Sequence, residues 1–194
     1  TLKCSREELQ AILAKEHVTT IPVDGVDTAL QVTSDAALFR TKAFADGCFE
    51  QQDAGSQLVA AAPEVTPGMR VIDACAGAGG KTLHIAAMME GKGRLLAMDV
   101  EEWKLENLKQ RARRAGAHNV ETRVITSSKT VKRLKESADR VLLDVPCSGL
   151  GVLQRNPDAK WRDTAERLPV LVALQEEILQ RYSQMVEVGG LLVY

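Results

Sequence analysis

From Pro63 onward, short runs of apolar and β-branched residues alternate with longer segments whose apolar residues recur at helical spacing. The runs that we expect to form strands are 71–74, 94–98, 121–126, 141–143 and 191–194. The segments that we expect to form helices are 81–90, 101–115, 130–137 and 168–188, with one more at 56–62. Alternating strands and helices require right-handed crossovers, which place helices on both faces of a parallel sheet. The pattern therefore predicts a doubly wound α/β fold.

The N-terminal part of the chain follows a different pattern. Ser5 and Glu8 have the spacing of a helix capping box, directly before the apolar residues of a short amphipathic helix. A strand is expected over 29–32, among many turn-forming residues. We therefore divide the chain into a small α+β accessory region, residues 1–62, and a core domain, residues 63–194.

A glycine-rich segment joins the first strand of the core to the helix that follows. Small residues let the backbone approach a ligand closely, and the helix N-terminus adds N–H donors. Asp99 ends the next strand, where an acid can accept both ribose hydroxyls of an adenosine-containing cofactor. The loop residues that we expect to contact the cofactor are Cys75, Ala76, Gly77, Ala78, Gly79, Gly80 and Lys81. Together, loop and acid predict a nucleoside-containing cofactor.

Three other interpretations of this loop stay open. Gly80-Lys81-Thr82 is similar to the end of a phosphate-binding P-loop, but Cys75 stands where that motif requires glycine. A nicotinamide-binding fingerprint would need a third glycine at the position of Thr82. The third interpretation is a tight turn that binds no ligand. Such a turn needs only one glycine, so it leaves the other two glycines of the segment unexplained.

A second motif, Asp144-Val-Pro-Cys-Ser-Gly149, follows the fourth strand of the core, at the edge where open α/β sheets bind ligands. Here the sequence resembles the RNA cytosine-C5 methyltransferase family, and the resemblance covers almost the whole chain. The segments that carry it, in order, are Phe49–Gln57, Asp73–Thr82, Asp144–Gly149 and Arg155–Trp161. The opening residues resemble the bacterial ribosomal-RNA branch of the family. The resemblance implies a Rossmann-like methyltransferase sheet.

The resemblance further implies S-adenosylmethionine as cofactor and ribosomal RNA as substrate. In such enzymes a cysteine thiolate adds to C6 of cytosine, which makes C5 nucleophilic enough to accept a methyl group. By resemblance, Asp144 binds near N3 and N4 of the base beside the cofactor, and Lys81 contacts O2. Cys147 is associated with the release step and is not the nucleophile. The alternatives are that Cys147 is a small buried thiol and that Asp144 caps the next loop.

The chain departs from the family pattern at three places. Gly77-Ala78 stands where the family has Ala-Pro, which loosens the loop. Ser127 lies near the place where the third strand usually ends in an acid close to the adenine, so we expect weak cofactor binding. The family nucleophile belongs to a Thr-Cys pair just past the fifth strand, beyond Tyr194. We therefore expect a truncated, inactive chain whose sheet is incomplete at its C-terminal edge.

Basic residues offer candidate RNA contacts. Two helices of the core carry many of them, but a charged helix is more often a solvated face than a binding site. Arg155, Lys160 and Arg162 flank the loop after the fourth strand and are better candidates for phosphate contact. Trp161 is expected to pack against that loop, with stacking on RNA bases as the alternative. The target cytosine has to be unpaired or flipped, because attack at C6 needs access to the face of the ring.

Composition narrows the class of protein. The 4 cysteines and 3 histidines are scattered, so we expect no metal site and no disulfide scaffold. A net charge of −1 argues against binding nucleic acid by bulk charge, although a local basic face is compatible with it. No apolar run approaches the ~20 residues of a membrane span, and no secretion leader is present. We expect a cytoplasmic monomer, and Thr1 suggests that the chain begins inside a longer protein.

Two rival functions remain at this point. One is a non-catalytic RNA-binding or ribosome-assembly factor that kept the fold and lost the nucleophile, which a stop codon directly after Tyr194 would favour. The other is a methyltransferase that acts on an exocyclic nitrogen. That class usually needs Asn/Asp-Pro-Pro-Tyr/Phe after the fourth strand, where this chain has Asp144-Val-Pro-Cys147.

Overall fold

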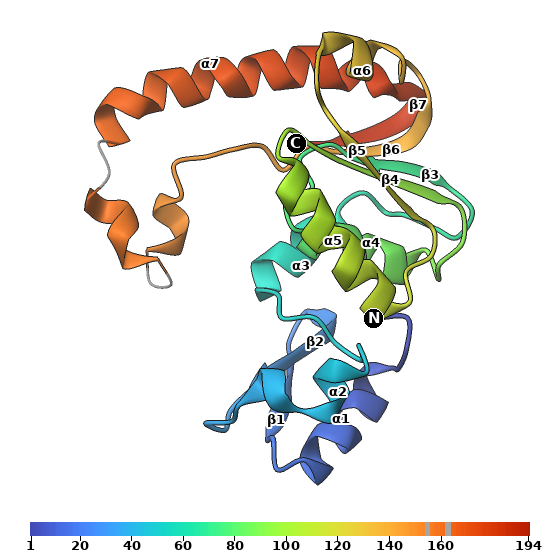
Figure 1. The fold of residues 1–194 in the computed structure, drawn as a ribbon, viewed down its shortest axis with the longest axis vertical. Coiled ribbons are helices and arrows are strands. Elements are labelled where there is room, and N and C mark those ends of the chain that lie inside the picture. The colour runs from blue at the N-terminus through green and yellow to red at the C-terminus, as the bar shows by residue number, and fades with distance from the viewer. Residues whose placement is uncertain (154–155, 162–163) are drawn as a thin grey trace.

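The structure is a computed structural model that describes residues 1–153, 156–161 and 164–194. Within these ranges, five parallel strands form a central sheet in the order β5-β4-β3-β6-β7 (Figure 1). The strands are β3 (Arg70–Asp73), β4 (Arg94–Asp99), β5 (Val120–Val124), β6 (Ala138–Leu142) and β7 (Val186–Val193). The predicted doubly wound α/β fold is confirmed, because every core strand expected from the apolar runs is present in this sheet.

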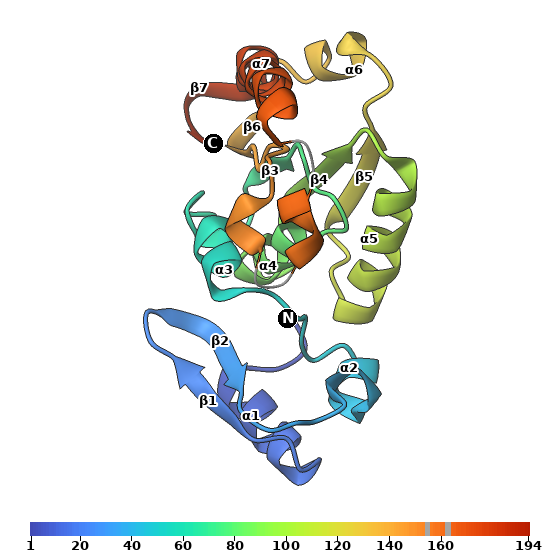
Figure 2. The same ribbon diagram turned by 90° about the vertical axis from the view of Figure 1, so that its left-hand side faces the viewer.

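Helices cover both faces of the sheet (Figures 1 and 2). Those on one face are α3 (Ala54–Ala61), α4 (Gly80–Met88) and α5 (Glu102–Ala115), and those on the other are α6 (Ser128–Lys132) and α7 (Thr164–Tyr182). In α5 the buried residues Leu105, Leu108, Ala112 and Ala115 recur every three or four positions. Such spacing gives a single apolar stripe, so the charged remainder of α5 faces away from the sheet.

The strand order reverses at the centre of the sheet. The chain runs from β3 outward to β4 and β5, then returns to pair β6 with the other side of β3. The connections after β3 and after β6 therefore leave toward opposite faces. Open α/β sheets bind ligands in the crevice that forms at such a point, at the carboxyl ends of the strands.

The predicted boundaries near the C-terminus are wrong in detail. The helix expected over 168–188 ends at Tyr182, and β7 begins at Val186 rather than at 191. A 3₁₀ turn, Ser183–Met185, separates the two elements and buries Met185 completely in the core beneath β6. The burial of Met185 in this core stabilises the turn that follows the helix.

β7 lies at the edge of the sheet, as the sequence predicts. Its residues 191–193 pair with residues 140–142 of β6, and the described part of the chain contributes no strand beyond it. An edge strand presents unpaired backbone donors and acceptors that another strand can cover. The described residues contain no helix with the length and apolar character needed to cross a membrane.

The accessory region is a small α+β unit below the sheet in Figures 1 and 2. Its elements are α1 (Arg6–Lys15), β1 (Thr20–Val23), β2 (Val26–Val32), η1 (Leu38–Arg40) and α2 (Lys42–Ala45). The capping box at Ser5 and Glu8 is confirmed, with both reciprocal hydrogen bonds present. The strand β1 was not expected from the sequence. Its residues pair antiparallel with β2, which includes the predicted strand 29–32.

The helix α3 contacts both parts of the chain. It packs against α4 of the core and against β2 of the accessory region, and Ala60 is fully buried in the core cluster. The predicted division into an accessory region, residues 1–62, and a core, residues 63–194, stays a prediction, because α3 packs against both parts.

Candidate functional site

The loop between β3 and α4 is folded tightly against β4. The Ala76 N–H donates to the Met98 carbonyl at 2.9 Å, and the Gly79 N–H donates to the Ala76 carbonyl at 2.9 Å. Gly77 and Gly79 have φ angles of 54° and 90°, which L side chains rarely adopt. A Cβ at Gly79 would lie 2.5 Å from a carbon of Leu108, so glycine is also required there by the close approach of α5.

Asp99 holds this loop from the end of β4. One carboxylate oxygen accepts the N–H of Gly77 at 2.9 Å, and the other accepts the N–H of Glu101 at 2.9 Å. Its side chain is only 8% exposed. Asp99, the predicted ribose-binding acid, therefore lies next to the predicted loop. It also holds the backbone of the loop at Gly77 and the backbone at Glu101, directly before α5, a role that the sequence did not reveal.

Asp73 lies at the end of β3 below the loop and is buried, with 1% exposure. Its Oδ2 accepts the Thr82 hydroxyl at 2.7 Å, while Oδ1 has no partner among the described residues. Burial, more than the nearby Asp144 charge, raises the pKa of the Asp73 carboxyl from 3.8 to about 6. A carboxyl placed in this way is ionised at neutral pH at a cost in folding free energy.

The raised pKa of Asp73 predicts a pH dependence of stability. Because the folded state holds the proton more tightly, the free energy of unfolding falls as pH rises from about 4 to 6, by up to about 3 kcal/mol. Asp73→Asn cannot ionise and keeps an oxygen for Thr82. Urea denaturation at pH 4.5 and 7.5 should show the variant gaining stability relative to the unmodified chain as pH rises. Parallel pH profiles of the two proteins would contradict this.

Lys81 and Asp144 meet beside the loop. Nζ of Lys81, in the first turn of α4, lies 2.6 Å from Oδ2 of Asp144, which follows β6. The Lys81 side chain is 18% exposed and that of Asp144 48% exposed, so the pair borders solvent. The two predicted catalytic side chains are thus brought together. They can present a donor and an acceptor to one planar ligand.

The two cysteines of the motifs have different surroundings. Burial, followed by the neighbouring carboxylates Asp73 and Asp99, raises the pKa of the Cys75 thiol to about 12, so it stays protonated. Cys147 is a free, exposed thiol on the loop after β6, and this contradicts the alternative that it is buried. That loop is tied to α7 by the Gln175 side-chain amide, which donates to the Pro146 carbonyl at 2.8 Å.

Ser127 is exposed at the N-terminus of α6. It lines a cavity of about 320 Å³ together with Ile125, Lys132 and Tyr182. The adjacent backbone is joined to the end of β4, because the Ile125 N–H donates to the Asp99 carbonyl at 2.9 Å. Ser127 thus follows the strand that pairs with β4, and its contact with an adenine stays a prediction.

The predicted RNA-contact residues are described only in part. Arg155 and Arg162 lie outside the described residues. Lys160 is exposed, and its ammonium stands 4.7 Å from the centre of the Trp161 ring. The prediction that Trp161 packs against the loop is wrong, because its side chain is 78% exposed and Ala159 takes the buried position instead.

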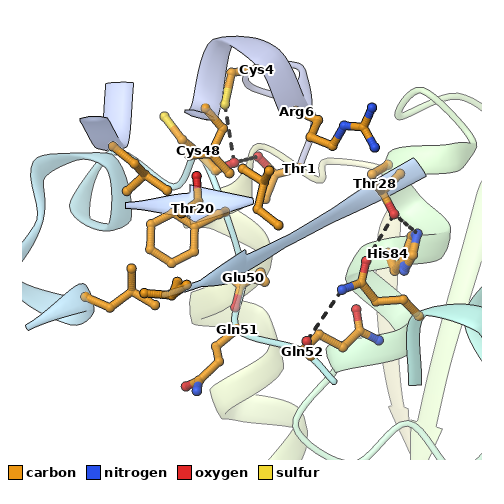
Figure 3. A pocket seen from close by; sticks show the side chains of 18 of the residues that line it. Thr1, Cys4, Arg6, Thr20, Thr28, Cys48, Glu50, Gln51, Gln52 and His84 are labelled. Atoms are coloured by element: carbon orange, nitrogen blue, oxygen red, sulfur yellow. Dashed lines mark hydrogen bonds between the residues drawn. The ribbon is translucent and has the colours of Figure 1, made fainter. Parts of the chain in front are cut away.

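A larger cavity, of about 920 Å³, lies between the accessory region and α4 (Figure 3). Thr28 of β2 reaches His84 of α4 at 3.3 Å across it, and hydrogen-bonds Gln57 at 3.1 Å. Burial lowers the pKa of the His84 imidazole, which is neutral at physiological pH. Of the predicted cofactor loop, Gly80 alone lines this cavity, so the rest of the loop lies outside it.

Sequence reasoning missed Glu50 and Arg111. The Glu50 carboxylate pairs with Arg111 and Arg114 of α5, and Arg111 also donates to the Ala78 carbonyl of the loop. The signal for Glu50 was its place in the segment Phe49–Gln57 that carries the resemblance. For Arg111 the sequence offers no signal, since it is one of several basic residues on a charged helix. Among the described residues, no group of three or more His, Cys, Asp or Glu side chains could hold a metal ion.

The chain is similar to known proteins along its whole length. A profile described as 16S rRNA methyltransferase RsmB/F matches residues 59–194. A probable ribosomal RNA small subunit methyltransferase B from Synechocystis sp. is 38% identical over 100% of the chain and 44% of its own length. The chain thus spans less than half of that relative.

Two solved structures share the fold along almost the entire chain. The crystal structure of PH0851 is 32% identical, with a TM-score of 0.93 over 99% of this chain and 44% of that one. A methyltransferase homologue from Pyrococcus horikoshii is 29% identical, with a TM-score of 0.85 over 100% of this chain and 61% of that one. The matched region contains the loop, Asp99 and the motif at 144–149. The chain belongs to the 16S rRNA methyltransferase RsmB/F family.

Proposed function

We propose that this chain is the S-adenosylmethionine-binding core of an enzyme that methylates C5 of cytosine in ribosomal RNA. The observation that carries the proposal is the Lys81–Asp144 pair, 2.6 Å apart, beside the cofactor loop and on the same sheet edge as Cys147. Family membership supports a methyltransferase that acts on ribosomal RNA. The cytosine and its C5 atom are inferred from these side chains and from the sequence resemblance.

The residues around the loop suit S-adenosylmethionine. The cofactor carries a sulfonium and an ammonium, and the acids Asp73, Asp99 and Asp144 surround the carboxyl ends of β3, β4 and β6. The unpartnered Oδ1 of Asp73 offers a buried acceptor. A Cβ at Gly77 or Gly80 would meet no atom within 4 Å, so open space adjoins the loop backbone. The cofactor, when bound, supplies an electrophilic methyl group.

In the proposed reaction the residues of this chain orient and activate the base. Asp144 accepts a hydrogen bond from the N4 side of cytosine, and the Lys81 ammonium offsets the charge that develops at O2 when a thiolate adds to C6. Separating the ion pair to admit the base costs little, because Asp144 is half exposed. We assign the nucleophile to the segment of the protein beyond Tyr194, and assign Cys147 to elimination of the enzyme.

RNA contact is part of the same proposal. We assign phosphate binding to Lys160, Arg155 and Arg162. The exposed ring of Trp161 beside the Lys160 ammonium offers a surface on which an unpaired base can stack, which supports this assignment. A non-catalytic RNA-binding factor remains the alternative function, and no observation on the site favours it over catalysis.

Trapping of a protein–RNA adduct tests the role of Cys147. In the protein whose chain continues past Tyr194, Cys147→Ala should accumulate a covalent adduct with substrate RNA under turnover conditions, because the elimination step fails. The adduct would run as a shifted band on a denaturing gel with labelled RNA. Cys48→Ala is the matched control, since Cys48 is a free thiol of the accessory region, and it should give no shifted band. Turnover by Cys147→Ala without any adduct would refute the release role.

A further inference from the structure

Glu50 joins the accessory region to α5. One carboxylate oxygen, Oε2, receives Nε and Nη2 of Arg111 at 3.1 and 2.9 Å, and the other oxygen receives Arg114. The Glu50 side chain is only 11% exposed. Both of its oxygens are therefore engaged by guanidinium groups in a partly desolvated place, where charge-assisted hydrogen bonds are strong. Figure 3 shows Glu50 at the wall of the larger cavity.

Arg111 has a second partner on the opposite side. Its Nη1 donates to the carbonyl of Ala78 at 2.5 Å. The planar guanidinium thus bridges a carboxylate of the accessory region and the backbone of the cofactor loop. Ala78 stands between two glycines with positive φ angles, which is the part of the loop with the greatest backbone freedom. A strong donor on this carbonyl restricts that freedom.

The accessory segment that carries Glu50 is itself fixed. The guanidinium carbon of Arg114 lies 3.9 Å from the centre of the Phe44 ring. The Thr1 hydroxyl donates to the Gly47 carbonyl at 2.8 Å, close to where that glycine packs on α5. The segment that carries Glu50 is therefore packed firmly against α5. From this position Glu50 can hold the Arg111 side chain in the orientation that reaches Ala78.

We infer that Arg111 is a positioning residue for the cofactor loop, and that Glu50 sets its orientation. Through this chain of contacts the accessory region fixes the conformation of Gly77–Gly80 and thereby raises affinity for the cofactor. The inference rests on the proposed function for the identity of the cofactor. The mechanical part, restraint of the loop by Glu50 and Arg111, holds whether or not that identity is right.

The test compares four variants of the 194-residue chain. Arg111→Gln removes both contacts, and Glu50→Gln removes the charge that orients Arg111. Arg114→Gln weakens the hold on Glu50 but has no contact with the loop, and Arg113→Gln changes an exposed arginine on the same helix. Hydrogen exchange of the amides of 77–80 is followed without cofactor, together with the melting temperature. The affinity for S-adenosylmethionine is then measured by calorimetry.

Arg111→Gln is expected to speed exchange of the loop amides and to weaken cofactor binding about tenfold, with a smaller effect of Glu50→Gln. Arg114→Gln should lower the melting temperature with little change in affinity, and Arg113→Gln should change neither quantity. Loop exchange in Arg111→Gln equal to that in Arg113→Gln would overturn the inference. If the unmodified chain binds no cofactor, the proposed function fails, and loop exchange alone still decides the role of Arg111.

Discussion

Replacing Asp99 with alanine is expected to weaken S-adenosylmethionine binding by at least about 100-fold. A carboxylate that accepts two ribose hydroxyls contributes about 1.5–3 kcal/mol per hydrogen bond, and each 1.4 kcal/mol is a factor of about ten. The same substitution frees the N–H groups of Gly77 and Glu101, so the loop also loses its restraint. Calorimetric titration up to millimolar cofactor should give no saturable heat.

Two further variants serve as controls for that loss. Glu102→Ala removes an exposed acid from the first turn of α5, close to Asp99, and should leave affinity unchanged. Asp99→Asn keeps one acceptor oxygen and should retain part of the binding. Circular dichroism checks that each variant is folded. Affinity retained by a folded Asp99→Ala would show that the ribose is bound elsewhere.

Gly47→Ala is expected to destabilise the chain by about 3 kcal/mol or more. A Cβ at Gly47 would lie 2.0 Å from the carbonyl oxygen of Arg114, which is backbone within a helix and cannot move aside alone. The φ angle of 76° adds strain for any L side chain. Overpacking of this kind typically costs about 1–3 kcal/mol before the backbone strain is added. Urea denaturation measures the total.

Gly25 provides the matched control for this glycine. Its φ of 74° is nearly the same, but a Cβ there would meet no atom within 4 Å. Gly25→Ala should therefore show the strain alone, about 1–2 kcal/mol. Equal losses in the two variants would mean that the accessory segment does not pack against α5 as closely as described. A selective loss in Gly47→Ala confirms the contact on which Glu50 depends.

The core fold could be predicted because its pattern is local. Buried parallel strands are continuous apolar runs, and α5 shows its single apolar stripe directly in the spacing of Leu105, Leu108 and Ala112. The strand β1, Thr20–Val23, gave no such signal. Two of its four residues are exposed and one is a proline, so it reads as part of a turn-rich segment until pairing with β2 is known.

The candidate site likewise has one part that the sequence predicts and one part that it does not. The glycine loop, Asp99 and the Asp144 motif are short segments whose residue types indicate their chemistry, and the structure brings Lys81 to Asp144. The tie between Glu50 and Arg111 joins residues 61 positions apart. No periodicity connects such positions, and a glutamate beside a phenylalanine has many possible roles. Long-range ion pairs of this kind follow only from the tertiary packing.

The proposed function is tested most directly by identifying the methylated atom. The protein whose chain continues past Tyr194 would be incubated with unmodified 16S rRNA and S-adenosylmethionine carrying a labelled methyl group. The RNA would then be digested to nucleosides. These are separated by chromatography beside 5-methylcytidine and N4-methylcytidine standards, because the two have the same mass, and the labelled nucleoside is identified by its retention and its mass. The proposed function predicts label in 5-methylcytidine, and none in a Lys81→Met variant that lacks the ammonium at the base. Label in N4-methylcytidine or another nucleoside, or no label with a folded, cofactor-bound protein, would contradict it.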